Sequence, residues 1–170
     1  MGAIEIQEAF TVTESSPGLL ADAMLGKLAR WLRLLGYDTL YLQGDDALLA
    51  HRARVEERIL LTRDHALARR RGLRAIIIAS ETLAAQLAQV VAEVEPPPEA
   101  SPRCMACNAP LTQISVEEAR LYVPPYVAAT QREFHRCPNC GKIYWKGTHW
   151  EGIRRQLDEA LRQGSADDGV

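Results

Sequence analysis

The chain has 170 residues, of which 47% are hydrophobic, and these values suit one globular domain with room for a small appendage. Its net charge of −2 gives no overall sign of a nucleic-acid partner. No apolar run approaches the roughly 20 residues that cross a bilayer, and the N-terminus lacks the basic segment and apolar core of a signal peptide. We therefore expect a cytoplasmic protein.

Residues 1–18 are expected to form a leader or an edge strand, because apolar and polar residues alternate there before a Ser-Ser-Pro-Gly break. From Leu19 onward, short apolar runs alternate with helical patterns. The predicted strands are 19–21, 39–42, 58–62 and 75–79, and the predicted helices are 23–35, 47–57, 65–71 and 80–92. Short connections between them predict an α/β domain over residues 19–95, with a parallel sheet flanked by helices.

The helical spacing also predicts which side chains face the core. In the first helix the apolar face would hold Met24, Leu25, Leu28, Trp31, Leu32 and Leu35. In the second helix, Leu48, Leu49, Ala53 and Val55 would point inward. Gly36 and Gly72 lie where each preceding helix should stop with positive φ.

Basic residues predominate between Lys27 and Arg74. On the first helix, Lys27, Arg30 and Arg33 form a stripe on a face other than the apolar one, and Arg63 lies further along the chain. A basic face inside a near-neutral protein is compatible with a polyanion partner, and equally with a solvated helix surface. The sequence leaves both interpretations open.

All four cysteines fall in two Cys-x-x-Cys pairs. Two such pairs, Cys104 with Cys107 and Cys137 with Cys140, can complete a tetrahedral zinc site that leaves no position for a catalytic water. Redox cysteines or disulfides are the alternatives. The pairs predict a zinc ribbon over residues 103–151, after a proline-rich linker at 96–102 and before a helix at 152–163 and a polar tail ending at 170.

Aromatic and basic residues surround the second cysteine pair. Rings interleaved with cations are suited to stacking on unpaired bases, although the same rings can form the small core of a ribbon. The candidates for RNA contact are Lys142, Trp145, Lys146, His149 and Trp150.

Aspartates follow three successive predicted strands. Asp22, Asp45 or Asp46, and Asp64 lie where a strand ends and a helix begins, so each can be a helix N-cap. The carboxyl ends of parallel strands also meet at one edge of a sheet, where ligands bind. Three carboxylates together imply a divalent cation such as Mg²⁺ or Mn²⁺, and Thr62 could hydrogen-bond a ligand there.

Three stretches of the chain carry a family resemblance. They are ADAMLGKLARWLRLLGYDT, ILLTRDHALARR and the cysteine pairs with VPPYVAATQREFHRCPNCGKIYWKGTHW. From about Leu19 to Leu157 the chain resembles the Mut-seven C-terminal RNase family, a PIN-like nuclease domain fused to a zinc ribbon. The sequence departs from the family at Ala47, where members often have an acidic residue, and no fourth carboxylate is assigned.

The resemblance implies a metal-dependent ribonuclease that acts on single-stranded RNA with help from the ribbon. The catalytic positions that it implies are Asp22, Asp46 with the adjacent Asp45, Thr62 and Asp64, of which Asp22, Asp46 and Asp64 would bind magnesium or manganese. The alternative is a non-catalytic module that binds RNA or protein and has an incomplete acidic centre.

Overall fold

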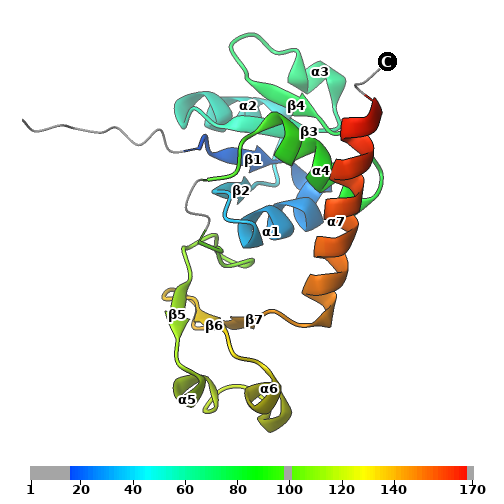
Figure 1. Ribbon diagram of the computed structural model, residues 1–170. Helices are drawn as coiled ribbons and strands as arrows, with labels where there is room; N and C mark the ends of the chain where they lie inside the picture. The colour runs from blue at the N-terminus through cyan, green and yellow to red at the C-terminus, as the bar shows by residue number, and fades with distance from the viewer. Residues whose placement is uncertain (1–15, 98–100, 168–170) are drawn as a thin grey trace, which may run out of the picture.

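The computed structural model of the protein describes residues 16–97 and 101–167 (Figure 1). The expected leader up to residue 15, the linker residues 98–100 and the last three residues of the tail lie outside the described residues. An α/β unit comes first in the chain, a small three-stranded sheet follows it, and a long helix returns to the α/β unit. The predicted α/β fold with a parallel sheet flanked by helices is confirmed.

The α/β unit alternates strands and helices throughout. Its elements are β1 (Leu19–Ala21), the 3₁₀ turn η1 (Ala23–Leu25), α1 (Gly26–Leu34), β2 (Thr39–Tyr41), α2 (Asp46–Val55), β3 (Ile59–Thr62), α3 (His65–Ala68), β4 (Ala75–Ile77) and α4 (Leu83–Glu93). Gly36, which follows the C-cap of α1, has φ of 96°, as expected for the residue that stops this helix. Gly72 also has positive φ, 76°, but α3 ends earlier than predicted, at Ala68 with Arg69 as its C-cap. None of the described helices is long and apolar enough to cross a membrane.

The four strands form one sheet in the order β2-β1-β3-β4, and all neighbours are parallel. Because β1 lies between β2 and β3, the chain passes to one side of β1 through α1 and to the other side through α2. Right-handed crossovers then put α1 and α2 on opposite faces of the sheet. The sheet is therefore covered on both sides, which explains why β3 is apolar and buried along its whole length.

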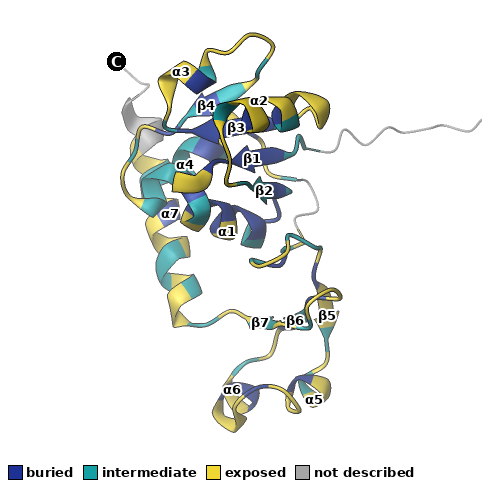
Figure 2. Cartoon of the chain, turned by 180° about the vertical axis from the view of Figure 1, so that it is seen from behind, coloured by how far each residue is buried: buried dark blue, intermediate teal, exposed yellow. Residues whose placement is uncertain are grey.

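Alternate residues of each strand enter two cores, one on each face of the sheet. Leu19 and Ala21 pack with α1, α4 and the C-terminal helix, whereas Leu20 packs with α2 and α3. Figure 2 shows the buried residues concentrated in this sheet and in α1.

The prediction of a core position is wrong for three residues. Met24 is 77% exposed, Leu48 41% and Val55 66%. Met24 lies in the 3₁₀ turn before α1, so the spacing of an α-helix does not reach back to it. In α2 the buried residues are Leu49, Ala50 and Ala53. The side chains of Leu48 and Val55 therefore point toward solvent.

The start of α4 and both ends of the C-terminal helix also differ from the prediction. Thr82 caps α4, rather than Ser80, by accepting a hydrogen bond from the backbone N–H of Ala85. The C-terminal helix α7 (Thr148–Asp167) extends beyond both ends of the predicted 152–163. It packs along α4, and its Leu157 is buried in the core on the α1 face.

The small sheet is antiparallel, in the order β5 (Thr112–Ile114), β6 (Phe134–Arg136) and β7 (Ile143–Trp145). Two short helices, α5 (Val116–Ala119) and α6 (Pro125–Thr130), lie between β5 and β6 and project away from the parallel sheet (Figure 1). They bury Phe134 under Val123, Val127 and Ala128. The expected ribbon therefore has a separate small core of its own.

Polar contacts join the ribbon to the α/β unit at β2. The backbone N–H of Thr39 donates to Asn108 Oδ1 at 3.1 Å, and Asn108 Nδ2 donates to Asp38 Oδ1 at 2.6 Å. Arg33, expected on an exposed stripe, is only 7% exposed. Its Nε donates to the carbonyl of Thr39 at 2.8 Å and its Nη1 to the carbonyl of Met105 at 2.7 Å. This arginine therefore connects α1, β2 and the first cysteine loop.

Replacing Arg33 by methionine should strongly destabilise the protein, because two carbonyl groups lose a charged donor in a buried setting. We expect a loss of about 3 kcal/mol of unfolding free energy, measured as a lower urea midpoint of the metal-loaded protein. Arg30→Met, on an exposed position of the same helix, is the matched control and should change stability by about 0.5 kcal/mol or less. Equal midpoints for the two variants would contradict this role of Arg33.

Candidate metal centre and acidic sheet edge

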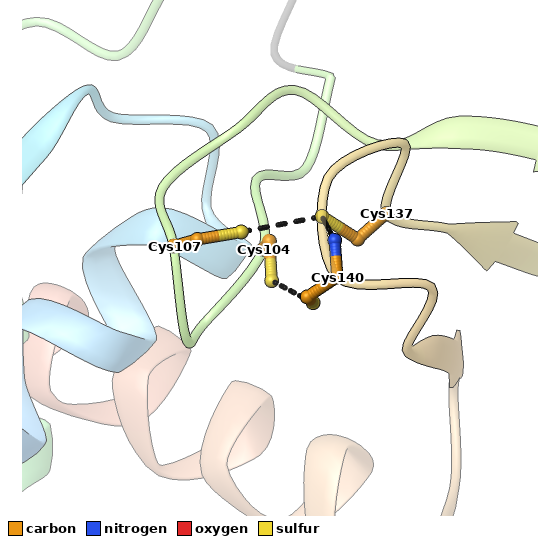
Figure 3. Close-up of side chains that lie close together, drawn as sticks. All are labelled: Cys104, Cys107, Cys137 and Cys140. Atoms are coloured by element: carbon orange, nitrogen blue, oxygen red, sulfur yellow. Dashed lines mark hydrogen bonds between the residues drawn. The ribbon is translucent and has the colours of Figure 1, made fainter.

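The four cysteines come together between the ribbon and α1. Their sulfur atoms all lie within 4.8 Å of one another (Figure 3). The Sγ atoms of Cys104 and Cys140 are 3.6 Å apart, and those of Cys107 and Cys137 are 3.3 Å apart. A tetrahedral zinc site with Zn–S bonds of about 2.3 Å has sulfurs roughly 3.8 Å apart. The cysteines are thus free thiols in an arrangement that can hold a structural metal ion such as zinc.

The backbone around each cysteine pair has the shape that such a site needs. Asn108 and Gly141, each following the second cysteine of a pair, have φ of 62° and 74°. The backbone N–H of Cys140 points to the sulfur of Cys137 at 3.5 Å. Gly and Asn tolerate this left-handed conformation better than other residues, which suits them to the two turns.

The surroundings lower the pKa of Cys104 and Cys137 and raise that of Cys107. Burial opposes ionisation of Cys104, but hydrogen bonds from the Tyr144 hydroxyl and from the N–H groups of Cys107 and Ala106 outweigh it and lower its pKa to about 6. Hydrogen bonds with the sulfurs of Cys137 and Cys104 raise the pKa of Cys107 to about 12. Four thiolates so close together need a positive ion among them.

The aspartates lie at the carboxyl edge of the parallel sheet, after three neighbouring strands. Asp22 directly follows β1, and Asp64 is separated from the end of β3 only by Arg63. These two strands are neighbours, since Ala21 pairs with Leu61 in a parallel ladder. Asp45 and Asp46 begin α2 after β2, on the other side of β1. The point between β1 and β3, where the connections leave in opposite directions, is where open α/β sheets bind ligands.

Thr62 joins the first and last of these aspartates. Its hydroxyl donates to Asp22 Oδ2 at 2.5 Å and accepts a hydrogen bond from the backbone N–H of Asp64 at 3.0 Å. Both Thr62 and Asp22 are buried, with Asp22 7% exposed. The second oxygen of Asp22 accepts from the N–H of Met24 at 3.1 Å.

Each of three aspartates also caps a helix, as the alternative interpretation expected. Asp22 caps η1, Asp45 caps α2 through the N–H of Leu48 at 2.8 Å, and Asp64 caps α3. Among the described residues, Asp64 accepts hydrogen bonds through Oδ1 alone, from the backbone N–H groups of Ala66 and Leu67 at 2.7 and 3.0 Å. Asp46 is in the first turn of α2, and its Oδ2 lies 3.5 Å from Nη2 of Arg70.

Within residues 16–97 and 101–167, the cysteines form the group of three or more side chains suited to hold a metal ion, and the aspartates form no such group. Capping turns Asp45 and Asp64 back toward their own helices, and Asp46 reaches toward Arg70. The acidic residues therefore share an edge of the sheet without converging on one point.

The candidate RNA-contact residues are divided between two regions. Lys27 and Arg30 are exposed on α1 and Arg63 is half-buried beside the acidic edge, whereas Arg33 is taken up by the contacts described above. On the ribbon side Lys142, Lys146 and His149 are exposed. The amine of Lys146 pairs with the carboxylate of Glu133 at 2.8 Å.

A cavity of about 560 Å³ lies where the ribbon meets α1 and α7. Trp145, Lys146, His149 and Trp150, all expected to contact RNA, line it. Residues not assigned from the sequence line it as well, above all Trp31, which had been placed only in the core, and Arg154 of α7. The helical spacing of Trp31 and Arg154 in the sequence does not indicate a cavity, because the cavity forms only where α7 packs beside α1.

Comparison with known proteins gives one family match. The model of the Mut7-C RNAse domain matches residues 17–157. No curated protein matches the chain, and no solved structure does. Because the match covers most of the chain, the protein belongs to the Mut7-C RNAse domain family.

Proposed function

We propose that this protein is a metal-dependent ribonuclease that hydrolyses phosphodiester bonds of single-stranded RNA at the acidic edge of the parallel sheet. Membership of an RNase domain family supports RNA as the substrate. The observation that carries the proposal is the linked set Asp22, Thr62 and Asp64 at the point between β1 and β3.

The buried carboxylate of Asp22 suits a divalent cation. It has two hydrogen-bond donors and, among the described residues, no Lys, Arg or His forms an ion pair with it or with Asp64. A buried charge without a cationic partner is costly. Carboxylate oxygens are the donors that Mg²⁺ and Mn²⁺ prefer. The environment of Asp22 therefore supports binding of such an ion.

In this proposal Asp22, Asp46 and Asp64 would hold one or two cations, with Asp45 adjacent. A bound divalent cation supplies a lower pKa for an attacking water and neutralises charge on the scissile phosphate. Thr62 fixes the orientation of Asp22, and its own hydroxyl is held by the N–H of Asp64. Lys27, Arg30 and Arg63 would bind the phosphates of the strand.

The ribbon has a structural role and a binding role in this proposal. Cys104, Cys107, Cys137 and Cys140 would hold one Zn²⁺ with no open position, so the site does not take part in the chemistry. Lys142, Trp145, Lys146, His149 and Trp150 would contact RNA.

The second candidate is a non-catalytic module that binds RNA or protein. The observation in its favour is that Asp22, Asp45 and Asp64 all cap helices and that the acidic residues form no compact group. Divalent-ion binding at the acidic edge separates the two candidates.

Purified protein should contain about one zinc per chain, because four thiolates complete a closed tetrahedral site. Stripping the zinc should unfold the ribbon, since metal binding and folding are coupled at such sites. Elemental analysis measures the content, and hydrogen exchange should show protection lost over β5–β7 while β1 and β3 keep theirs. Absence of stoichiometric zinc, or native disulfides in a mass spectrum, would rule this site out.

Asp64→Asn should abolish most cleavage without loss of folding. Asparagine caps a helix as well as aspartate does, but it removes the charge that would hold the cation. Mn²⁺-dependent cleavage of single-stranded RNA should fall by about a hundredfold or more, while the thermal midpoint changes little.

Glu117→Gln is the matched control, since it removes one exposed acidic charge in α5, far from the sheet edge. It should cleave like the unaltered protein. Wild-type cleavage by Asp64→Asn, or no cleavage by the unaltered protein with any divalent ion, would favour the binding module instead.

Thr62→Val should weaken activation by the metal, because the carboxylate of Asp22 loses its hydroxyl donor. Removing such a supporting hydrogen bond typically costs about 10- to 100-fold in metal affinity or activity. The measurement is the Mn²⁺ concentration that gives half-maximal cleavage, which should rise for Thr62→Val and return toward normal for Thr62→Ser. If serine and valine behave alike, the hydroxyl does not position Asp22 for the ion.

A further inference from the structure

All three tryptophans of the chain line the cavity between the ribbon and the α/β unit. They come from three different elements, Trp31 from α1, Trp145 from β7 and Trp150 from α7. The cavity volume of about 560 Å³ lies within the range of roughly 300–1,000 Å³ that small-ligand sites occupy.

The rings differ in how far they are already packed. Trp31 is buried and stacks on Trp150, with ring centroids 5.6 Å apart and planes inclined by 13°. His149 meets Trp31 edge-on at 5.4 Å. Trp145 is 38% exposed, and no ring contact is found for it within the described residues. The cavity thus has a packed aromatic wall and one partly exposed indole, that of Trp145, without a ring contact among the described residues.

The polar groups around the cavity match a nucleotide better than a purely apolar ligand. Lys146 and Arg154 provide positive charge. Lys146 pairs with Glu133 at 2.8 Å and Arg154 with Asp158 at 3.5 Å, but their side chains are 60% and 56% exposed and so remain accessible to a phosphate. Gln113, Glu133 and His135 offer donors and acceptors. An unpaired base is held by stacking on aromatic rings and by hydrogen bonds to its edges, with cations near its phosphate.

We propose that this cavity binds one unpaired base of the RNA strand, stacked against Trp145, with Lys146 and Arg154 near the adjoining phosphate. The choice of RNA rests on the function proposed above. The cavity would therefore be an anchor for the substrate, separate from the edge where the strand is cut.

Helix α1 connects the two sites. It follows Asp22 after the 3₁₀ turn η1, and its last residue, Leu34, lines the cavity. Lys27 and Arg30 lie between them and, at spacings of three and four residues, on the same side of the helix as Leu34. The rise along α1 from Gly26 to Leu34 is roughly 12 Å at about 1.5 Å per residue. The three residues of η1 add about 6 Å at about 2 Å per residue, so the two sites are no more than roughly 18 Å apart along this path.

This distance sets the offset between anchor and cut. A stacked strand rises roughly 3.4 Å per nucleotide, so a strand following Lys27 and Arg30 would place the anchored base no more than about five nucleotides from the scissile bond. An extended strand would need fewer. The proposed substrate is therefore single-stranded over at least this length.

Tryptophan fluorescence tests the anchor directly, because every tryptophan of the chain lines it. Oligoadenylate of about eight nucleotides, enough to cover the roughly 18 Å between the sites, is titrated into the zinc-loaded protein without Mg²⁺ or Mn²⁺. We expect quenching on binding. A fully abasic strand of equal length and charge should give no quenching and bind about tenfold more weakly or worse, since stacking is lost.

Trp145→Ala should weaken binding of oligoadenylate by about tenfold. The matched control is Tyr126→Ala, which removes an exposed ring from α6 of the same ribbon, outside the cavity, and should bind as the unaltered protein does. Equal affinity of the two variants, or equal binding and quenching by the abasic strand, would overturn the proposal. The abasic comparison uses the unaltered protein, so it decides the matter even where Trp145→Ala fails to fold.

Binding and cleavage separate this proposal from the proposed function. Quenching by oligoadenylate in a protein that cleaves no RNA would keep the base anchor and refute the nuclease. Cleavage without quenching would keep the nuclease and refute the anchor. If both hold, kcat/KM should rise as substrates lengthen to about five nucleotides beyond the cut, the span estimated from α1, and Trp145→Ala should lose that gain.

Discussion

The candidate site depends first on how β1 pairs with its neighbours. β1 is only three residues long, yet it is fully buried and bonded to β2 on one side and to β3 on the other. The register that pairs Ala21 with Leu61 continues into the hydrogen bond from the N–H of Asp22 to the carbonyl of Leu61 at 3.2 Å. A shift of one residue would turn Leu20 to the wrong core and move Asp22 away from Thr62. Apolar packing on both faces therefore fixes the position of a polar group that is not part of either core.

The second constraint is the exposed side of β2, which is an edge strand. Unpaired backbone groups on such an edge invite association with other chains unless something covers them. Here Asn108 accepts from the N–H of Thr39, and Arg33 donates to its carbonyl. Asn108 also has the positive φ that closes the first cysteine loop. Asn108 thus shapes the cysteine site and also provides a hydrogen-bond acceptor for the edge strand β2. These contacts hold the ribbon in one orientation, so the cavity beside it has a defined wall.

The sequence allowed most of the α/β unit to be predicted, because its signals are local. Apolar runs such as Ile59–Leu61, the glycine stops and the cysteine spacing each depend on a few neighbouring residues. What could not be predicted depends on contacts distant in the chain. Arg33 looks like a surface cation until the cysteine loop supplies the carbonyl of Met105, and Trp31 looks like an ordinary core residue until α7 brings Trp150 against it. The length of α7 was underestimated for the same reason, since its stability comes from packing on α4 rather than from helix propensity.

Helix capping and metal binding by the aspartates are compatible uses of the same side chains. A carboxylate has two oxygens with about four acceptor positions, and a cap occupies one or two of them. In Asp64 the cap uses Oδ1 alone, and its second oxygen accepts no hydrogen bond within the described residues. Asp22 uses one oxygen for the cap and the other for the Thr62 hydroxyl, which leaves a lone pair on each. Bonds to the backbone hold these carboxylates in fixed orientations, as a precise binding site requires. The capping geometry is thus a condition under which two short strands and two short helices can present acidic groups to a cation.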